Sequence, residues 1–314
     1  MQVPDALSSW LKTAATSTVQ VSWARVAPPW GVRVDPKEDL ALHIVLEGSC
    51  WIARPDAEPL QLLQGDLVVA NGLAHDLVHA PGGHSVSAQE FRKRPPPLTN
   101  VGTTAVVCAS YCSDVHITRQ MLRVLPPVMY LTASQARSIP HLATAIDLAT
   151  AEIIEPGPGS ELLITYLFDA LFLYLLRAWL NISKLEVGWL AALQDRCVSQ
   201  TLSRMHADPA RQWTVDDLAA EAGISRATFS RRFTKRMGEA PLSYLTRWRM
   251  TLAMQVLAET RTPLATLARN VGYESEFAFS RAFKRYYGAA PSAFRQRNTL
   301  APATVPFLLP NQLA

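Results

Sequence analysis

Two segments near the end of the chain place guanidinium, hydroxyl and carboxylate groups along one side of what their spacing predicts to be a helix. Arginine pairs with phosphates and can donate two hydrogen bonds to guanine, while a carboxylate can accept one from cytosine. Two phenylalanines four residues apart would bury the opposite side of each helix. These are Phe229 and Phe233, then Phe279 and Phe283; the other sides carry Arg226, Ser230, Arg231 and Thr234, then Glu276, Phe277, Ser280, Arg281 and Arg285.

The two segments are parts of an internal repeat. Gly223 matches Gly272 at an offset of 49 residues, and after one inserted residue Phe229 matches Phe279 at an offset of 50. Both copies end in Gly-x-x-Pro. A repeat of this length indicates one supersecondary unit that is used twice.

Each copy is predicted to contain two helices joined by a tight turn. Thr214, with Asp217 three residues later, is a helix start, and Thr262-Pro263 starts the equivalent helix. The glycine that follows suits a turn with positive φ or close backbone approach, and Ser225 or Ser275 begins the second helix. The pattern predicts a helix-turn-helix, whose second helix lies in the major groove of DNA. Two ordinary helical hairpins with a solvated basic surface are the alternative.

Charge is distributed unevenly along the chain. Residues 210–298 hold 15 Lys/Arg and 7 Asp/Glu, a net charge of +8, whereas the whole chain holds 30 and 26, a net charge of +4. The remainder is therefore at −4. This asymmetry indicates that a surface for nucleic-acid phosphates is confined to the last third of the chain.

Residues 213–297 resemble the DNA-binding domain of the AraC/XylS family of bacterial transcription regulators. The matching stretches are A-x-x-x-G-I-S with F-S-R-R-F, the connecting P-L-S-Y-L-T-R-W-R-M, and V-G-Y-E-S-E with F-S-R-A-F-K-R and G-x-x-P-S-x-F-R. The resemblance implies two helix-turn-helix units, held apart by a helix from Pro241 to about Ala258. These units would enter successive major grooves on one side of the duplex.

The resemblance also implies which side chains face DNA. The implied base contacts are Ala227, Ser230 and Arg231 in the first groove, and Glu276, Phe277 and Arg281 in the second. The implied phosphate contacts are Arg226, Arg232, Lys235, Lys284 and Arg285. Phosphate contacts position a protein on DNA, whereas base contacts specify the sequence.

The 314 residues are too many for a typical single domain and suggest two. Met1 to Lys12 shows no secretory signal. The four cysteines match neither a Cys-x₂-Cys zinc pattern nor a secreted disulfide framework, so we expect a cytoplasmic protein.

Short strands with turn residues between them are predicted from Val19 to about Cys112, with a surface loop at Pro95-Pro96-Pro97. This pattern favours a β-barrel or sandwich. His43 to Ile52, followed by Gln64 to His75, resembles the small cupin barrels fused to some AraC-type regulators. The predicted fold class is therefore α+β and multidomain, with an N-terminal cupin-like barrel and a C-terminal all-α domain.

The cupin resemblance raises the possibility of a metal or effector site at His43, Glu47 and His75, because His and carboxylate bind several divalent metals. Val45 stands where metal-binding cupins carry a second histidine. The alternative makes His43 a partly buried strand residue and Glu47 a turn residue. We therefore expect no cofactor and no enzymatic activity, although a divalent metal in the barrel is compatible with the residues.

The cysteines are a second candidate for sensing. Cys108 and Cys112 would point to the same side of one strand, about 13 Å apart, which is too far for a disulfide unless the strand ends between them. A redox role for Cys50, Cys108 or Cys112 and inert burial are both compatible with the sequence.

The pattern changes to helical from residue 131. Leu142, Ile146, Ala149 and Ile153 form an apolar stripe, and Leu162 to Leu180 is apolar on nearly all sides but short of the ~20 residues that span a bilayer. This long helix is predicted to pair two subunits of a homodimer, with a purely intrachain core helix as the alternative. One connecting helix should follow, from Glu186 to about Pro209.

The expected organisation is a barrel over residues 1–130, a helical linker and dimerisation segment over 131–190, a DNA-binding domain over 191–298 and an irregular tail over 299–314. The expected function is transcription regulation, with activation favoured over repression. Operator DNA, RNA polymerase, a second subunit and a small-molecule or redox effector are the expected partners, and no membrane. An enzyme housed in the barrel and an architectural DNA binder without sequence preference are the alternatives.

Overall fold

The computed structural model describes residues 5–14, 18–35, 40–93, 102–112 and 125–298. The chain forms two compact units, residues 14–195 (the sheet unit) and residues 1–13 with 196–314 (the helical unit). Helix α1 (Ala6–Ala14), apart from its last residue, therefore groups with the helical unit, although the predicted boundaries place it with the barrel. The loop predicted at Pro95-Pro96-Pro97 and the tail predicted over 299–314 lie outside the described residues.

The sheet unit contains two five-stranded sheets. The first is antiparallel throughout, in the order β1-β9-β3-β6-β10. Its strands are β1 (Thr18–Val26), β9 (Thr104–Cys112), β3 (Leu40–Glu47), β6 (Leu67–Asn71) and β10 (Val128–Leu131). The second has the order β5-β4-β7-β2-β8, and its last pair is parallel. Its strands are β5 (Ala57–Leu63), β4 (Ser49–Arg54), β7 (His75–Val78), β2 (Gly31–Val34) and β8 (Val86–Ser87).

Of the two predicted arrangements, a β-barrel or a sandwich, the cupin-like barrel of the predicted fold class needs correction, because the described strands do not close it. Among the described strands, no ladder joins the two sheets at their edges. Instead, Val45, Val68 and Val106 from the first sheet pack with Ile52 and Leu77 from the second in one apolar core. An alternation of apolar and polar residues tells which face of a strand is buried, but it does not tell which edges pair. Two facing sheets therefore satisfy the same pattern as a barrel.

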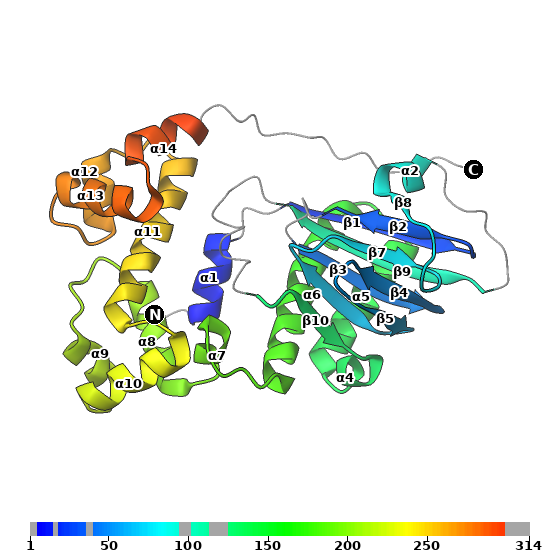
Figure 1. Cartoon of the computed structure of the whole chain (residues 1–314), viewed down its shortest axis with the longest axis horizontal. Coiled ribbons are helices and arrows are strands. Elements are labelled where there is room, and N and C mark those ends of the chain that lie inside the picture. The colour runs from blue at the N-terminus through cyan, green and yellow to red at the C-terminus, as the bar shows by residue number, and fades with distance from the viewer. Residues whose placement is uncertain (1–4, 15–17, 36–39, 94–101, 113–124, 299–314) are drawn as a thin grey trace. The chain divides into compact units, whose positions relative to one another are not determined.

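Helices cover the outer face of the first sheet (Figure 1). They are α4 (Ala133–Arg137), α5 (Pro140–Ile154) and α6 (Ser160–Ile182). The Tyr111 hydroxyl on β9 donates to the Phe168 carbonyl on α6 at 2.7 Å, and the Tyr111 ring lies 5.3 Å from the Phe172 ring. By length and composition α6 resembles a membrane span, as core helices of soluble proteins also do. The contacts of Phe168 and Phe172 with β9 place the middle of α6 in the core of the sheet unit.

One expected helix is in fact two. The segment predicted to run from Glu186 to about Pro209 forms α7 (Trp189–Leu193) and α8 (Arg196–Ala207). The Gln194 N–H bonds to carbonyls of Ala191 and Ala192, which closes α7 before α8 begins. The boundary between the two units falls at this break. A further short helix, α2 (Ala88–Lys93), follows β8.

The helical unit contains two helix pairs at the two ends of one long helix (Figure 1). The first pair is α9 (Val215–Glu221) with α10 (Arg226–Met237), and the second is α12 (Leu264–Asn270) with α13 (Glu276–Tyr287). Helix α11 (Pro241–Glu259) lies between them, and α14 (Pro291–Asn298) follows. The four phenylalanines of the repeat are fully buried, as their spacing predicts.

Candidate nucleic-acid interface

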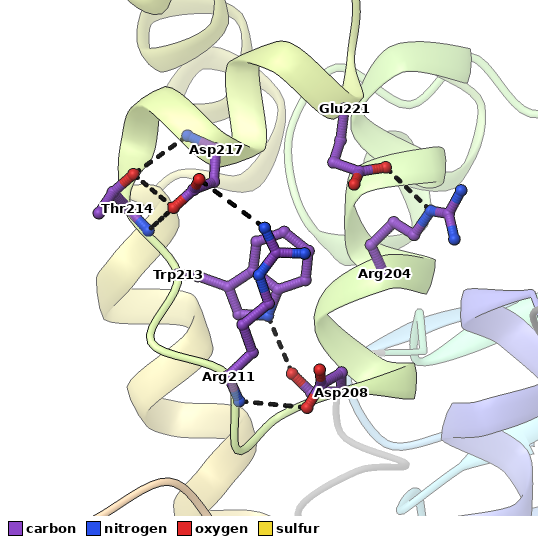
Figure 2. Close-up of polar contacts among 7 residues, drawn as sticks. All are labelled: Arg204, Asp208, Arg211, Trp213, Thr214, Asp217 and Glu221. Carbon is purple, nitrogen blue, oxygen red and sulfur yellow. Dashed lines mark hydrogen bonds and ion pairs between the residues drawn. The ribbon is translucent and has the colours of Figure 1, made fainter.

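The first helix pair begins with a capping box. The Thr214 side chain accepts from the Asp217 N–H at 3.1 Å, and an Asp217 carboxylate oxygen accepts from the Thr214 N–H at 2.9 Å (Figure 2). These two bonds satisfy donors that a helix start leaves free, as the sequence predicts. Hydrogen bonding to Thr214 lowers the pKa of Asp217, which keeps this carboxylate ionised.

The segment before α9 is held by its own side chains (Figure 2). The Trp213 Nε1–H donates to the Asp208 carbonyl at 2.9 Å, and the Arg211 N–H donates to the Asp208 carboxylate at 3.1 Å. The Arg211 guanidinium lies 3.9 Å from the Trp213 ring centroid, and its Nη2 is 3.7 Å from Asp217 Oδ1. The segment and the start of α9 therefore form one ordered structure.

Helix α10 presents the first candidate recognition surface. Ser225 caps it by accepting from the Thr228 N–H at 3.3 Å. Of the three base-contact candidates, Ala227 and Arg231 are exposed and Ser230 is half-buried. Ala227 and Arg231 lie on the side away from the buried Phe229 and Phe233, and Ser230 lies at the edge of that side. These three candidates therefore carry one guanidinium, one hydroxyl and one methyl group.

Helix α13 presents the second candidate surface. Ser275 caps it by accepting from the Ala278 N–H at 3.1 Å. Glu276, Phe277 and Arg281 are all exposed, and Phe277 keeps 71% of its surface open. The Arg281 guanidinium lies 5.7 Å from the Phe277 ring centroid. An exposed aromatic ring beside a guanidinium is typical of a binding surface rather than of a core.

The five phosphate candidates are exposed around these two helices: Arg226, Arg232, Lys235, Lys284 and Arg285. Arg226 has an acidic neighbour, because its Nη1 lies 3.0 Å from Asp216 Oδ2 with both side chains about two-thirds exposed. An exposed pair of this kind contributes little to stability, so Arg226 remains available for exchange onto a phosphate. Sequence reasoning did not identify this partner.

Comparisons with known proteins agree with this geometry. A cupin family model matches residues 5–181, and a helix-turn-helix domain model matches residues 218–297. A putative AraC-like transcription regulator from Streptomyces antibioticus is 34% identical over 279 residues, which cover 85% of this chain and 90% of that protein.

The chain belongs to the AraC family of transcription regulators. The RCS-specific transcriptional activator RclR of Escherichia coli is 28% identical over 83% of this chain and 86% of its own length. The solved DNA-binding domain of AdpA, in complex with a target DNA, is 32% identical and covers 31% of this chain and 87% of that chain, with a TM-score of 0.30.

In the sheet unit of this AraC-family regulator, two of the three candidate ligands lie together. His43 Nε2 is 2.7 Å from His75 Nε2, and His43 Nδ1 is 3.0 Å from Cys108 Sγ. The other His75 nitrogen lies 2.8 Å from the Leu73 carbonyl, so it must donate. The tautomers follow in order: His75 Nε2 accepts from His43, and His43 Nδ1 accepts from the Cys108 thiol.

Burial keeps both imidazoles neutral. It lowers the pKa of His43 well below its ordinary value, with a further contribution from His75, and it also lowers the pKa of His75. Two neutral imidazoles and a thiol therefore form a hydrogen-bonded chain. Among the described residues no group of three or more His, Cys, Asp or Glu side chains is arranged to hold a metal ion.

Glu47 does not join this cluster. Its carboxylate forms an ion pair with Arg25 on β1, with Arg25 Nε donating at 3.0 Å. The register of β3 against β9 shifts between Val45 and Glu47. A bulge of this kind inserts one residue and reverses the alternation of faces, so Glu47 leaves the face that carries His43.

The candidate redox cysteines are also separated by environment. Cys50 is fully buried, and burial raises the pKa of its thiol to about 12. Cys108 is half-buried beside His43, and the side chain of Cys112 lies outside the described residues. Within the described part of the chain, Cys50, Cys108 and Cys197 form no disulfide.

A residue that the sequence did not single out holds the segment that precedes the first helix pair. Arg249, on α11, donates from Nε to the Pro209 carbonyl at 2.7 Å and from Nη2 to the Arg211 carbonyl at 2.8 Å. Its neighbours Trp248 and Met250 are buried. A charged residue between two apolar ones in a connecting helix is a weak signal, and nothing in the sequence identifies its backbone partners.

Proposed function

We propose that this regulator binds specific operator DNA through two helix-turn-helix units, one in each helix pair, in response to a signal received by the sheet unit. The observation that supports this proposal is the pair of solvent-facing helices α10 and α13. Each is capped by a serine, buries two phenylalanines and exposes an arginine at the matching position, Arg231 or Arg281. The relatives are transcription regulators, so we expect no enzymatic activity.

Mapping of bound sites across the genome, repeated with purified protein at physiological salt, tests the proposal. A shared motif with half-sites about one helical turn apart would support two reading units. Diffuse binding without a motif, with specific and non-specific affinities that converge, would instead indicate an architectural DNA binder.

In this proposal Ala227, Ser230 and Arg231 face the first groove, and Glu276, Phe277 and Arg281 face the second. Arg281 can read guanine through two donors, Glu276 can accept from cytosine, and Phe277 can pack on a thymine methyl group. The five basic side chains around them neutralise phosphates. Substituting one of these five with alanine should reduce the salt slope of binding by about one.

The functional form is a homodimer in the cytoplasm that contacts RNA polymerase and activates transcription. RclR is named as an activator, which supports this direction of control. The dimer surface is the exposed apolar face of α5 and the start of α6, formed by Leu148, Leu162, Leu163 and Tyr166. Sedimentation of Tyr166→Lys should show a monomer, while Glu161→Lys, at the start of the same helix, should remain dimeric.

The effector site is a cavity of about 800 Å³ between the outer face of the first sheet and helices α4 and α5. This volume lies in the range of small-molecule pockets. Trp23, Ile44 and Ile146 supply apolar wall, and Arg137 and Asp147 supply charge. The chemistry fits a small molecule with an apolar body and an ionised group.

Anilinonaphthalene sulfonate, an apolar fluorophore with one anionic group, is a direct probe of this cavity. We expect Ile146→Trp to fill the cavity and abolish the fluorescence increase seen with the wild type. Thr144→Trp, at an exposed position of the same helix outside the lining of the cavity, is the matched control and should retain it. Equal fluorescence in both variants would place the effector elsewhere.

A small molecule is favoured over thiol oxidation, because the Cys50 thiol stays protonated and the thiolate is the reactive form. Cys108→Ala should leave the transcriptional response to peroxide unchanged, and abolition of that response would assign the signal to oxidation.

The regulator carries no resident metal in this proposal, since both nitrogens of His43 already have partners. Metal analysis of purified protein tests that statement. Stoichiometric metal together with catalytic turnover would support the alternative of an enzyme housed in the barrel.

A further inference from the structure

The segment from Asp208 to Trp213 contacts both halves of the repeat. Toward the first pair, Arg211 lies beside Asp217 in the capping box of α9, and Trp213 is anchored on Asp208 (Figure 2). Any movement of this segment must therefore displace the start of the first helix pair.

The same segment reaches the turn of the second pair. The Gln212 side-chain amide donates to the Gly272 carbonyl at 2.8 Å, and this glycine forms the turn between α12 and α13. Arg249 holds the segment from the side of α11 through the Pro209 and Arg211 carbonyls. Its guanidinium therefore lies between the first pair's lead-in segment and the second pair's turn.

The two equivalent glycines differ in their surroundings. Both have positive φ, +67° at Gly223 and +82° at Gly272. A Cβ at Gly223 would meet nothing within 4 Å, whereas a Cβ at Gly272 would lie 2.7 Å from Arg249 Nη2 and 2.8 Å from the Ala210 carbonyl oxygen. At position 223 glycine is thus required only for the positive φ. At position 272 it is also required because neighbouring atoms leave no room for a Cβ.

We propose that Arg249, Gln212 and Gly272 form a bracket that fixes the separation and angle of α10 and α13, and so sets the half-site spacing that the regulator accepts. This inference rests on the proposed function, because it assumes that both pairs read DNA. Arg249 and Gln212 are positioning residues with no direct contact to bases.

The physical reason is the cost of loose geometry. When two binding modules are linked, the second contact is intramolecular and raises the overall affinity by about 10²- to 10⁴-fold, provided that both can engage together. One added base pair moves a half-site by about 3.4 Å along the duplex and rotates it by about a tenth of a turn. A rigid bracket rejects such a site, whereas a loosened one tolerates it.

Full-length protein and DNA selected by the wild type from random sequence provide the test. Duplexes with one or two base pairs inserted or removed between the half-sites are compared with the selected site. We expect the wild type to bind the altered spacings about 100-fold more weakly. Gly272→Ala and Arg249→Met should bind the selected site about 10-fold more weakly and show little of this preference. Arg249→Lys should restore part of it.

Gly223→Ala is the matched control, because it carries the same positive-φ strain in the equivalent turn without the close contacts. It should keep the wild-type ratio between correct and altered spacings. If Gly272→Ala does not fold, as judged by circular dichroism, Arg249→Met carries the test. An unchanged spacing ratio in Arg249→Met would overturn the bracket.

A second readout needs no DNA. Spin labels attached through ketone-bearing amino acids at positions 235 and 284 report the distance between α10 and α13. We expect a narrow distribution in the wild type and Gly223→Ala and a broader one in Gly272→Ala and Arg249→Met. Equal widths in all four proteins would overturn the bracket. A different outcome would contradict the proposed function instead. In it, the wild type binds all half-site spacings equally well but shows a narrow distance distribution, so the two helix pairs would not read two grooves.

Discussion

The two helix pairs share a sequence pattern but differ in how they are built and in what they expose. The first pair starts with a capping box at Thr214, whereas the second starts at Pro263 without a side-chain cap. The first turn is open around its glycine, and the second is closed around it. A repeat can thus preserve a fold while its two copies take on different constraints.

The exposed surfaces diverge in the same way. Helix α10 presents a methyl, a hydroxyl and a guanidinium group, while α13 presents a carboxylate, an aromatic ring and a guanidinium beside that ring. We therefore expect the second half to discriminate more strongly between base pairs. The first half should depend more on phosphate contacts.

The largest expected effect tests whether the halves fold together. Phe229→Ala and Phe279→Ala each remove a fully buried ring, so each should lower the free energy of unfolding by about 3–5 kcal/mol. Thermal melts measure the loss, and amide hydrogen exchange shows where it falls. If each substitution exposed only its own helix pair, the halves would be independent folding units.

The next effect concerns base reading. Arg281→Ala should cost about 1–3 kcal/mol of binding free energy and relax specificity at one base pair. Binding to a set of single-base variants of the selected site measures this. Lys284→Ala, one turn away, is the control and should weaken all sequences alike. If Arg281→Ala also weakened all sequences alike, Arg281 would be a phosphate contact.

Acid should destabilise the first helix pair before it destabilises the second. His206 on α8 is buried against Tyr244 and Trp248, and Tyr244 also contacts Phe233 of the first pair. Burial lowers the pKa of His206 from 6.5 to about 3. The pKa of His206 is lower in the folded state than in the unfolded state. The stabilisation from the buried neutral imidazole is therefore complete above pH 6.5 and is lost as the pH falls towards 3.

Between pH 7 and pH 5 the free energy of unfolding should fall by about 2 kcal/mol because of His206. Urea unfolding at the two pH values measures it, and His206→Phe should remove this part of the pH dependence. An unchanged pH dependence in His206→Phe would mean that other groups, such as His43 and His75, account for it.

The smallest expected effect compares the two helix starts. Thr214→Ala removes a capping box and should cost about 1 kcal/mol of stability. Thr262→Ala precedes a helix that has no side-chain cap, so its cost should be only a few tenths of a kcal/mol. Equal costs would show that the capping box contributes nothing beyond the threonine itself.

The sequence predicted the helical unit better than the sheet unit. The repeat, the cap at Thr214, the helix starts near Ser225 and Ser275, and the four buried phenylalanines are confirmed, because helix patterns depend on residues three or four apart. Strand β10 lies beyond the segment in which strands are predicted. With four residues, it is too short to show an alternation.

The spacing of residues along the chain gave a wrong prediction where a regular strand or helix was interrupted. His43 and Glu47 are four apart and belong to one face of a regular strand, but the bulge after Val45 sends Glu47 to Arg25. In the same way, the predicted connecting helix breaks at Gln194 between α7 and α8. Neither interruption has a glycine or proline to announce it.

The sequence by itself determined the family, the repeat, and the buried and exposed faces of its helices, because each depends on residues close together in the chain. Only the tertiary structure decided that His43 joins His75 and Cys108, and that Arg249 holds the segment before the first helix pair. Those partners are distant in sequence, and in the Arg249 contacts they are backbone carbonyls, which every residue carries. No residue type could have revealed them.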